Sequence, residues 1–534
     1  MNLFRNAARF ARGQFQFNRE FSADPQNRAA TGDALAEFML GLAANGTVGN
    51  ENGENIYQKS LALFVQDDWK IAKNLTVNLG LRYDIFYAPT FPDDQVSNFL
   101  LDYTHTGAGA QLQQVRPKSG SDCGCQNDLK NFGPRVGLDY RLNKKTVFRS
   151  GFGLLYGMFD DLQYEASIFK NQPPDFAEYT FPTLDRVNAR LSLQNGFPAV
   201  QLPATSVPGP QSVGINSQQP YNRNQYSEQW FFDVQREAPF DLLVTLGYTG
   251  NSSRELSGQI NYNLPIGPSP LPIASRYYWP YYTAVTRLFP AGNLSFNAMT
   301  VKVEKRFTRG LTFLSAFTWS HAIDNVPPDP TLNQYQGGPQ GPVPYDFGLN
   351  RGNSQTDVRR TYVLSATYEL PVGRGKRWLS NSRPLDFLLG GWQLGGILTE
   401  RDGTPFTVAT AGGITNAGGA DRPNRLRDGT LPPSQQTIDR WFDVSAFLVQ
   451  PQFTYGNAGR NILFGPALHN LDFSLAKSFP ITESKRVQLR FESFNFTNTP
   501  AFGQPASTIN QAGAATITTA GAPRNIQFAL KFLF

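Results

Sequence analysis

The side chains that most often carry out chemistry are few in this sequence and lie far apart. The 534 residues include three histidines, His105, His321 and His469. Neither the His-Glu-x-x-His pattern of zinc proteases nor the Gly-x-Ser-x-Gly pattern of hydrolases occurs. The segment Gly373-Arg-Gly-Lys376 lacks the first glycine of a phosphate-binding loop, so we interpret it as a turn. We therefore expect no catalytic residues, no cofactor, no metal centre and no enzymatic activity.

Two polar loop segments could hold an ion or a local disulfide. Cys123 and Cys125 are the only cysteines. Their Cys-Gly-Cys spacing could form a strained disulfide, provide half of a metal site, or leave two thiols without a role. Asp160, Asp161 and Glu165 could bind a cation, although a solvated loop is the simpler interpretation. Neither segment by itself predicts a function.

The charged residues that do form a pattern alternate with apolar residues along segments of about ten residues. In residues 75–84, apolar side chains occupy every odd position, while Arg82 and Asp84 occupy even positions. Because successive side chains of a β-strand point to opposite faces, such a strand has one apolar and one polar face. Outer-membrane barrels place the first against lipid and the second against the lumen. The pattern recurs to the end of the chain and predicts these lumen-facing residues: Arg82, Asp84, Arg135, Asp139, Arg149, Arg490 and Glu492.

Charges and aromatic rings near the strand ends agree with this assignment. A charge on the lipid face near the membrane centre would cost about 2–4 kcal/mol. The four charges of lipid-facing parity lie near strand ends, where a long side chain can reach the interface. They are Asp67, Lys305, Arg360 and Lys477. Tryptophan and tyrosine also gather near strand ends, as in an aromatic girdle: Trp69, Trp230, Trp319, Trp392, Tyr156 and Tyr248.

The connections between these segments alternate between short and long. Short turns on one side and long loops on the other are typical of outer-membrane barrels, with the short turns in the periplasm. We count about 14 strands, including a weaker first one near residues 6–17, and expect a short amphipathic helix over Asp33–Ala43 in the first extracellular loop. The predicted fold is all-β, a transmembrane antiparallel β-barrel. The short turns lie near 71–74, 143–145, 239–241, 308–310 and 480–485, and the long segments near 89–130, 158–225, 251–294, 324–357, 404–466 and 499–523.

The composition excludes several other classes of protein. Charged residues make up 17% of the chain, against about 25% in typical soluble proteins. No run of about 20 apolar residues predicts a membrane-spanning helix. The net charge of +6 includes no Lys/Arg run, so nucleic acid is not an expected partner. Long loops disfavour soluble β-sandwiches. The first 20 residues lack the apolar region of a signal peptide.

Several segments resemble TonB-dependent receptors, and more specifically their Oar-like members, over nearly the whole chain. The resemblance implies that residues 1–534 are the C-terminal part of a 22-stranded barrel, incomplete at the N-terminus, without plug, TonB box or signal peptide. The C-terminal strand resembles the signal that the barrel-assembly machinery recognises, through Ile526, Phe528, Leu530, Phe532 and Phe534. The segments are 64–69 (FVQDDW), 75–83 (LTVNLGLRY), 368–376 (YELPVGRGK), 390–394 (GGWQL), 403–406 (GTPF), 440–447 (RWFDVSAF), 459–461 (GRN) and 491–498 (FESFNFTN).

The resemblance also implies a function. Such a protein lies in the outer membrane of a Gram-negative bacterium, captures a scarce nutrient with its extracellular loops, and imports it with energy from TonB. Its partners would be outer-membrane lipid, the barrel-assembly machinery, the TonB system through the plug, and a small-molecule, glycan or peptide ligand that the sequence does not identify. Lumen-facing charges would then contact the plug. A passive porin-like channel and a surface adhesion or structural role remain alternatives.

Overall fold

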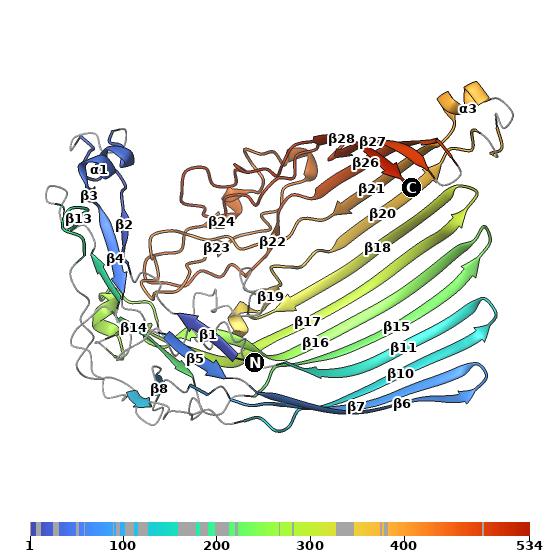
Figure 1. Ribbon diagram of the computed structural model, residues 1–534. Helices are drawn as coiled ribbons and strands as arrows, with labels where there is room; N and C mark the ends of the chain where they lie inside the picture. Colours follow the sequence, from blue (N-terminus) through green and yellow to red (C-terminus); the bar gives the residue numbers. More distant parts are fainter. Residues whose placement is uncertain are drawn as a thin grey trace.

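A sheet of 15 strands dominates the computed structural model (Figure 1). Thirteen of its strands follow one antiparallel path in sequence order, so each strand pairs with the strand before and after it on the path. The all-β class predicted from alternation is thus confirmed. The model describes residues 2–6, 12–24, 31–49, 53–57, 59–88, 90–91, 97–101, 112–115, 127–157, 178–181, 189, 191–197, 213–218, 223–265, 267–279, 282–326, 347–373, 376–378, 383–482 and 485–534.

The path begins at β6 and ends at β28, and the sheet curves between these two edges (Figure 1). Within the described residues β6 and β28 do not pair with each other, so the sheet forms an open wall. The strands of the path are β6 (Ser60–Ala72), β7 (Leu75–Phe86), β10 (Phe132–Asn143), β11 (Thr146–Tyr156), β15 (Tyr226–Ala238), β16 (Leu242–Asn261), β17 (Tyr282–Thr308), β18 (Leu311–Asp324), β20 (Arg360–Glu369), β21 (Trp392–Arg401), β26 (Leu468–Pro480), β27 (Arg486–Phe494) and β28 (Asn525–Leu533).

Short turns join the strands at one end of the sheet, which we call the turn end, and long segments join them at the other, the loop end. The turn between β17 and β18 shows how the sequence makes a tight reversal. Arg309 and Gly310 both have positive φ, 52° and 85°, as a type I′ hairpin requires. One turn-end connection is longer than the sequence suggested. Residues 370–391, between β20 and β21, include the helix α3 (Arg383–Leu389).

The segment 251–294, predicted as a long loop, is largely strand. β16 continues to Asn261 and β17 begins at Tyr282, and the two pair along this extension. A register shift after Ser253, beside Glu255 with φ 55°, separates the extension from the regular ladder. The apolar/polar alternation fails there because strands that extend beyond the lipid do not need one apolar face.

The helix predicted at Asp33–Ala43 is present as α1 (Ala34–Leu40). The Asp33 carboxylate accepts hydrogen bonds from the first-turn amides of the helix, and Gly41 ends it with φ 69°, as helix caps of these types do. The buried Glu37 carboxylate accepts from the backbone amides of Asn18 (2.9 Å) and Phe21 (2.5 Å). The helix is therefore tied to the chain that precedes it.

Within the described residues, the segment 6–17 contributes no strand to the large sheet, contrary to the weak first strand predicted there. β1 (Asn2–Asn6) pairs with β5 (Gly53–Tyr57), and β2 (Gln14–Gln16) pairs with β4 (Asn45–Gly49). Gly13 between them has φ 77°, a conformation that interrupts a strand. No helix in the described part of the chain is both long and apolar enough to cross a membrane.

Residues 402–467 and 495–524, here called the loop layer, fold against the loop end of β21, β26, β27 and β28 (Figure 1). Their core is built from Phe406, Phe442, Phe447 and Leu463. A second, smaller core joins Phe99, Ile215, Tyr282 and Val285. The remaining elements are β3 (Leu42–Ala43), β8 (Asn98–Leu101), β9 (Leu112–Val115), β12 (Glu178–Phe181), β13 (Leu191–Ser192), β14 (Val213–Gln218), η1 (Ile273–Arg276), η2 (Phe347–Asn350), β19 (Gly352–Asn353), β22 (Pro405–Phe406), β23 (Asn424–Arg425), η3 (Pro433–Gln435), η4 (Val444–Ala446), β24 (Phe447–Leu448) and β25 (Leu463–Phe464).

Candidate functional site

Seven charged side chains named from the sequence come to one face of the sheet. Arg149 of β11 pairs across the ladders with Asp139 of β10 and Asp233 of β15. The same register, followed from strand to strand, brings Arg82 of β7 and Arg490 of β27 to that face. We call it the polar face and the opposite one the apolar face. The seven are Arg82, Asp84, Arg135, Asp139, Arg149, Arg490 and Glu492.

Most charges of the polar face neutralise one another in pairs. Arg135 instead lies between Gly80 and Gly153 of the neighbouring strands, whose missing side chains leave it room. The half-exposed Arg149–Asp139 pair contributes about 0–1 kcal/mol to stability, whereas Asp84 is buried in its pair. Together the pairs make a polar wall of little net charge. The pairs are Arg82 Nε–Asp84 Oδ2 (2.9 Å), Arg149 Nε–Asp139 Oδ1 (3.1 Å), Lys302–Glu304, and Arg490 Nη2–Glu492 Oε1 (2.9 Å).

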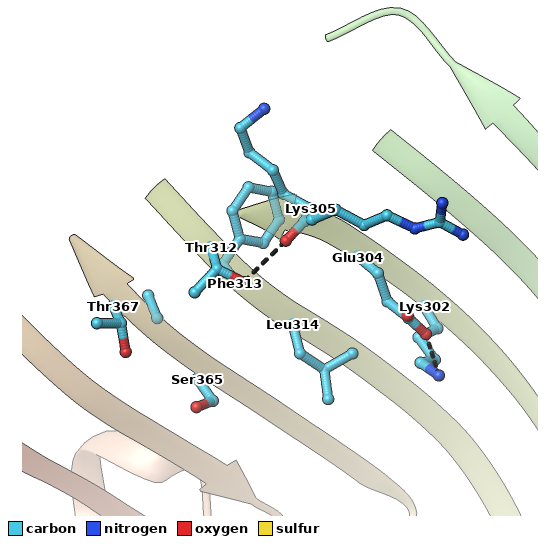
Figure 2. A pocket seen from close by; sticks show the side chains of 10 residues that line it. Lys302, Glu304, Lys305, Thr312, Phe313, Leu314, Ser365 and Thr367 are labelled. Carbon is cyan, nitrogen blue, oxygen red and sulfur yellow. Dashed lines mark hydrogen bonds and ion pairs between the residues drawn. The ribbon is translucent and has the colours of Figure 1, made fainter. Parts of the chain in front are cut away.

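A pocket of about 370 Å³ lies near the turn end of β17, β18 and β20 (Figure 2). In Figure 2 the Glu304 carboxylate points toward the Lys302 ammonium, and the Thr312 hydroxyl donates to the Lys305 carbonyl at 2.9 Å. Ser365 contributes a further hydroxyl to the lining. These groups can donate and accept hydrogen bonds to a polar partner. Among the described residues, no group of three or more His, Cys, Asp or Glu side chains could hold a metal ion.

The apolar face carries the C-terminal aromatic strand. Phe528 of β28 pairs with Phe491 of β27, with ring centroids 5.5 Å apart, and Phe534 follows the strand with a 98% exposed side chain. Ile526, Leu530 and Phe532 share the face of Phe528. The residues expected to form the assembly signal thus make one apolar stripe along an edge of the sheet, with the terminal ring beyond it.

Three of the four charges on the apolar parity find partners at strand ends. Lys305 Nζ donates to the Phe240 carbonyl at 2.5 Å. Arg360 makes two hydrogen bonds to the Asp402 carboxylate, at 2.8 and 3.1 Å. Lys477 donates to two backbone carbonyls next to α3. Each cation is therefore held at an end of the sheet rather than at its centre.

A buried arginine clamps the loop layer to the β18–β20 connection. Arg460 is 2% exposed, and its guanidinium forms an ion pair with Asp324, donates to the Asp324 carbonyl at 2.7 Å, and donates to the Asn350 carbonyl at 2.7 Å. The Arg422 guanidinium donates to the Asn350 side chain at 2.9 Å. Burial first, and then the charge of Arg460, lower the pKa of Arg422 to about 10. Carbonyls and a carboxylate accept hydrogen bonds from these two buried cations, as buried charges require, and the contacts tie the two segments together.

Asn461 extends this clamp through its side chain and its backbone. Its Nδ2 donates to the Asn353 carbonyl and its carbonyl accepts from Asn353 Nδ2, both at 2.7 Å. Thr407 donates to Asn461 Oδ1 at 2.9 Å. Asn461 has φ 53°, which asparagine tolerates better than most residues. The segment Gly459-Arg-Asn461, singled out in the sequence by resemblance alone, therefore has a structural role.

Other sequence predictions lie outside the described residues: Cys123, Cys125, Asp160, Asp161, Glu165 and His105. Sequence reasoning missed two features, the partners of Arg460 and the helix α3. For α3 the signal was length: 22 residues lie between Glu369 and Trp392, far more than a short turn needs. The first had no local signal because Asp324 and Asn350 lie more than 100 residues from Arg460 in sequence.

A meander of long strands with one apolar and one polar face, short turns at one end and long loops at the other, defines an outer-membrane barrel wall. The chain belongs to the family of outer membrane β-barrel domains, whose model matches residues 1–527, and its place is the outer membrane. No curated protein sequence matches it.

Three outer-membrane transporters or receptors are among the solved structures to which the chain is similar. The chain is similar to the outer membrane transporter YddB from Escherichia coli, with 7% identity over 91% of this chain and 55% of that one, and a TM-score of 0.45. It is similar to the ferric citrate transporter FecA, with 9% identity over 92% and 50%, and a TM-score of 0.42. The ferripyoverdine receptor of Pseudomonas aeruginosa gives 10% identity over 92% and 39%, and a TM-score of 0.39. The chain thus spans between 39% and 55% of the length of these proteins.

Proposed function

We propose that residues 1–534 form the barrel domain of a TonB-dependent receptor that imports a scarce nutrient across the outer membrane. The observation that carries the proposal is the buried clamp at Arg460. A segment that resembles the Oar-like receptors, Gly459-Arg-Asn461, supplies it, and it fixes the loop layer relative to β18. A receptor needs loops held in one arrangement to capture a dilute ligand.

The polar face supplies the second part of the proposal. We infer that it lines the lumen, with the pairs at Arg82, Arg149 and Arg490 as contacts for a plug. A wall of neutralised pairs offers donors and acceptors along its whole height without strongly attracting ions of one sign. Outer-membrane lipid would meet the apolar face, and the stripe from Ile526 to Phe532 with the terminal Phe534 would be recognised by the barrel-assembly machinery. TonB would act through the plug.

Uptake measurements distinguish this proposal from its alternatives. The full gene product would be produced in a Gram-negative host that lacks its own receptors for ferric citrate, a ferric catecholate, cobalamin and a maltodextrin. We expect one labelled probe to accumulate only when TonB and the proton-motive force are intact. A passive porin would admit small probes equally well without TonB. An adhesion protein would admit none while the cells still bind a surface, and either result contradicts the proposal.

A further inference from the structure

The connection between β20 and β21 places a small apolar helix at the turn end of the sheet. α3 has one polar side, which faces the protein, and one apolar side, which is exposed. The Asp386 carboxylate lies against Gly373 and Gly390, toward the protein, whereas Phe387 and Leu388 are 65% and 62% exposed. Removing such an apolar surface from water is favourable, so the exposed side of α3 favours a nonpolar surrounding.

The exposed side of α3 continues the apolar face of the sheet. The rings of Phe387 and Phe479, the latter on β26, lie 5.2 Å apart. Phe479 pairs with Val487 on the same face as Leu489 and Phe491. The helix therefore lies at the point where the apolar face meets the rim of the turn end, at the upper right of Figure 1.

A cation on the apolar parity fastens the helix there. Lys477 Nζ donates to the Gly390 carbonyl at 2.7 Å and to the Leu388 carbonyl at 3.1 Å, and it lies 4.9 Å from the ring centroids of Trp392 and Phe479. Trp392 Nε1 also donates to the Leu388 carbonyl, at 3.2 Å. A cation at a helix C-terminus satisfies carbonyls that lack helical partners. A lysine whose stem packs among aromatic rings while its amine reaches polar groups at the strand end is typical of a membrane interface.

A cavity of about 720 Å³ separates α3 from the β26–β27 turn. Its lining includes Phe387, Phe479 and Ile481, and the Ile481 side chain is 65% exposed. Lys376 and Arg486 belong to the same lining. Apolar groups beside cations match the acyl chain and the phosphate of a glycerophospholipid.

We propose that α3 is an interfacial anchor, lying in the lipid leaflet at the turn end with Phe387, Leu388 and Leu389 inserted among acyl chains. The occupant of this surface is lipid because the surface is continuous with the apolar face, which meets lipid in an outer-membrane barrel. The inference rests on membrane insertion of the barrel. It assigns a lipid-inserted segment to the turn end of the barrel. Connections at that end are ordinarily short turns.

The test uses the full chain in phosphatidylcholine nanodiscs. In a Cys123→Ser, Cys125→Ser background, an environment-sensitive fluorophore is attached at Leu388→Cys, at Leu489→Cys on the apolar face, or at Lys144→Cys in the β10–β11 turn. We expect the Leu388 label to emit as from a nonpolar environment. Lipids brominated near the glycerol should quench it more strongly than lipids brominated near the methyl end. The Leu489 label should be in lipid and the Lys144 label in water.

The three labels separate the possible failures. If the Leu388 label behaves like the Lys144 label while the Leu489 label is in lipid, the anchor is wrong and membrane insertion stands. If the Leu489 label is also in water, insertion itself fails and the anchor fails with it. A Leu388 label that becomes nonpolar only after a periplasmic extract is added would identify a protein-docking surface instead, which also overturns the anchor.

Discussion

At the scale of single residues, Arg460 is expected to contribute most to the stability of the loop layer, because its charged side chain is buried in an ion pair with Asp324. Replacing one partner of a buried ion pair leaves the other charge uncompensated and costs about 3–5 kcal/mol. We expect Arg460→Met to lower the free energy of opening throughout residues 402–467 by an amount in that range. Amide hydrogen exchange measures this free energy. Arg440→Ala, which removes an exposed arginine from the same layer, is the matched control and should cost about 0–1 kcal/mol.

A double variant shows whether the cost comes from the orphaned carboxylate. Removing both charges with Asp324→Leu and Arg460→Met should recover much of the lost stability, because no buried charge then lacks a partner. If the double variant is as unstable as the two single variants added together, the hydrogen bonds to the Asn350 and Asp324 carbonyls matter more than the ion pair.

Asp443 makes the loop layer sensitive to acid. Its carboxylate accepts from the Ser445 hydroxyl at 2.7 Å and from Arg427 at 2.7 Å. The Ser445 hydrogen bond first, and Arg427 after it, hold the pKa of Asp443 below its ordinary value despite some desolvation. A depressed pKa stabilises the fold above the unfolded-state pKa of about 3.9, and this stability is lost as pH falls through the folded-state pKa. Amides of η4 should therefore lose protection below about pH 4, measured as exchange rates divided by the intrinsic rates at the same pH, and Asp443→Asn should flatten that dependence.

At the scale of elements, alternation predicted strands well wherever a strand has to cross lipid. β7 and β27 correspond to the predicted segments because one apolar face leaves a period-two pattern in the sequence. The pattern is silent where strands pair in water, as in the extension of β16 and β17, and where a partner is distant, as at Arg460. The polar parity of Arg82 and Glu492 could be read from sequence for the same reason. Their ion-pair partners, two residues away on the same strand, also depend on side-chain rotamers that the sequence does not give.

The assignment of faces can be tested with neighbouring residues on one strand. Leu246 and Thr245 lie on opposite faces of β16. We expect Leu246→Arg to cost about 2–4 kcal/mol, the cost of an arginine facing lipid near the membrane centre. Thr245→Arg should cost much less. Urea unfolding in lipid vesicles measures both, and equal costs would mean that the polar face does not line a lumen.

The β17–β18 turn depends on a residue without a side chain. Gly310 has φ 85°, and a Cβ there would lie 2.7 Å from the Glu369 carbonyl. Gly310→Ala should therefore cost about 1–2 kcal/mol, the price of a left-handed conformation for an L-residue. Gly153→Ala is the control because its Cβ would meet neighbours only at ordinary contact distance, 3.6 Å or more. The same vesicle unfolding experiment compares the two.

At the scale of the whole molecule, the two edges of the sheet are very different. β6 has an exposed edge at one end of the path, and β28 at the other ends the chain on its aromatic stripe. Unpaired edges are not tolerated in lipid. The wall must therefore meet further strands, or close on itself, before it is stable in a membrane, and assembly has to bring the edges to their partners.

A variant of the terminal residue, Phe534, can distinguish recognition by the assembly machinery from a contribution of the ring to packing. Phe534 lies beyond β28 with its side chain almost fully exposed, so Phe534→Ser removes little burial and should leave refolding into pure lipid vesicles unchanged. In cells, the same variant should lower the amount of folded protein in the outer membrane, measured as heat-modifiable migration on gels, because the assembly machinery would read the ring. Phe240→Ser, which removes another exposed ring at the turn end, should have no such effect. If Phe534→Ser slows refolding in pure lipid as much as it lowers yield in cells, the ring acts through folding and the proposed recognition is wrong.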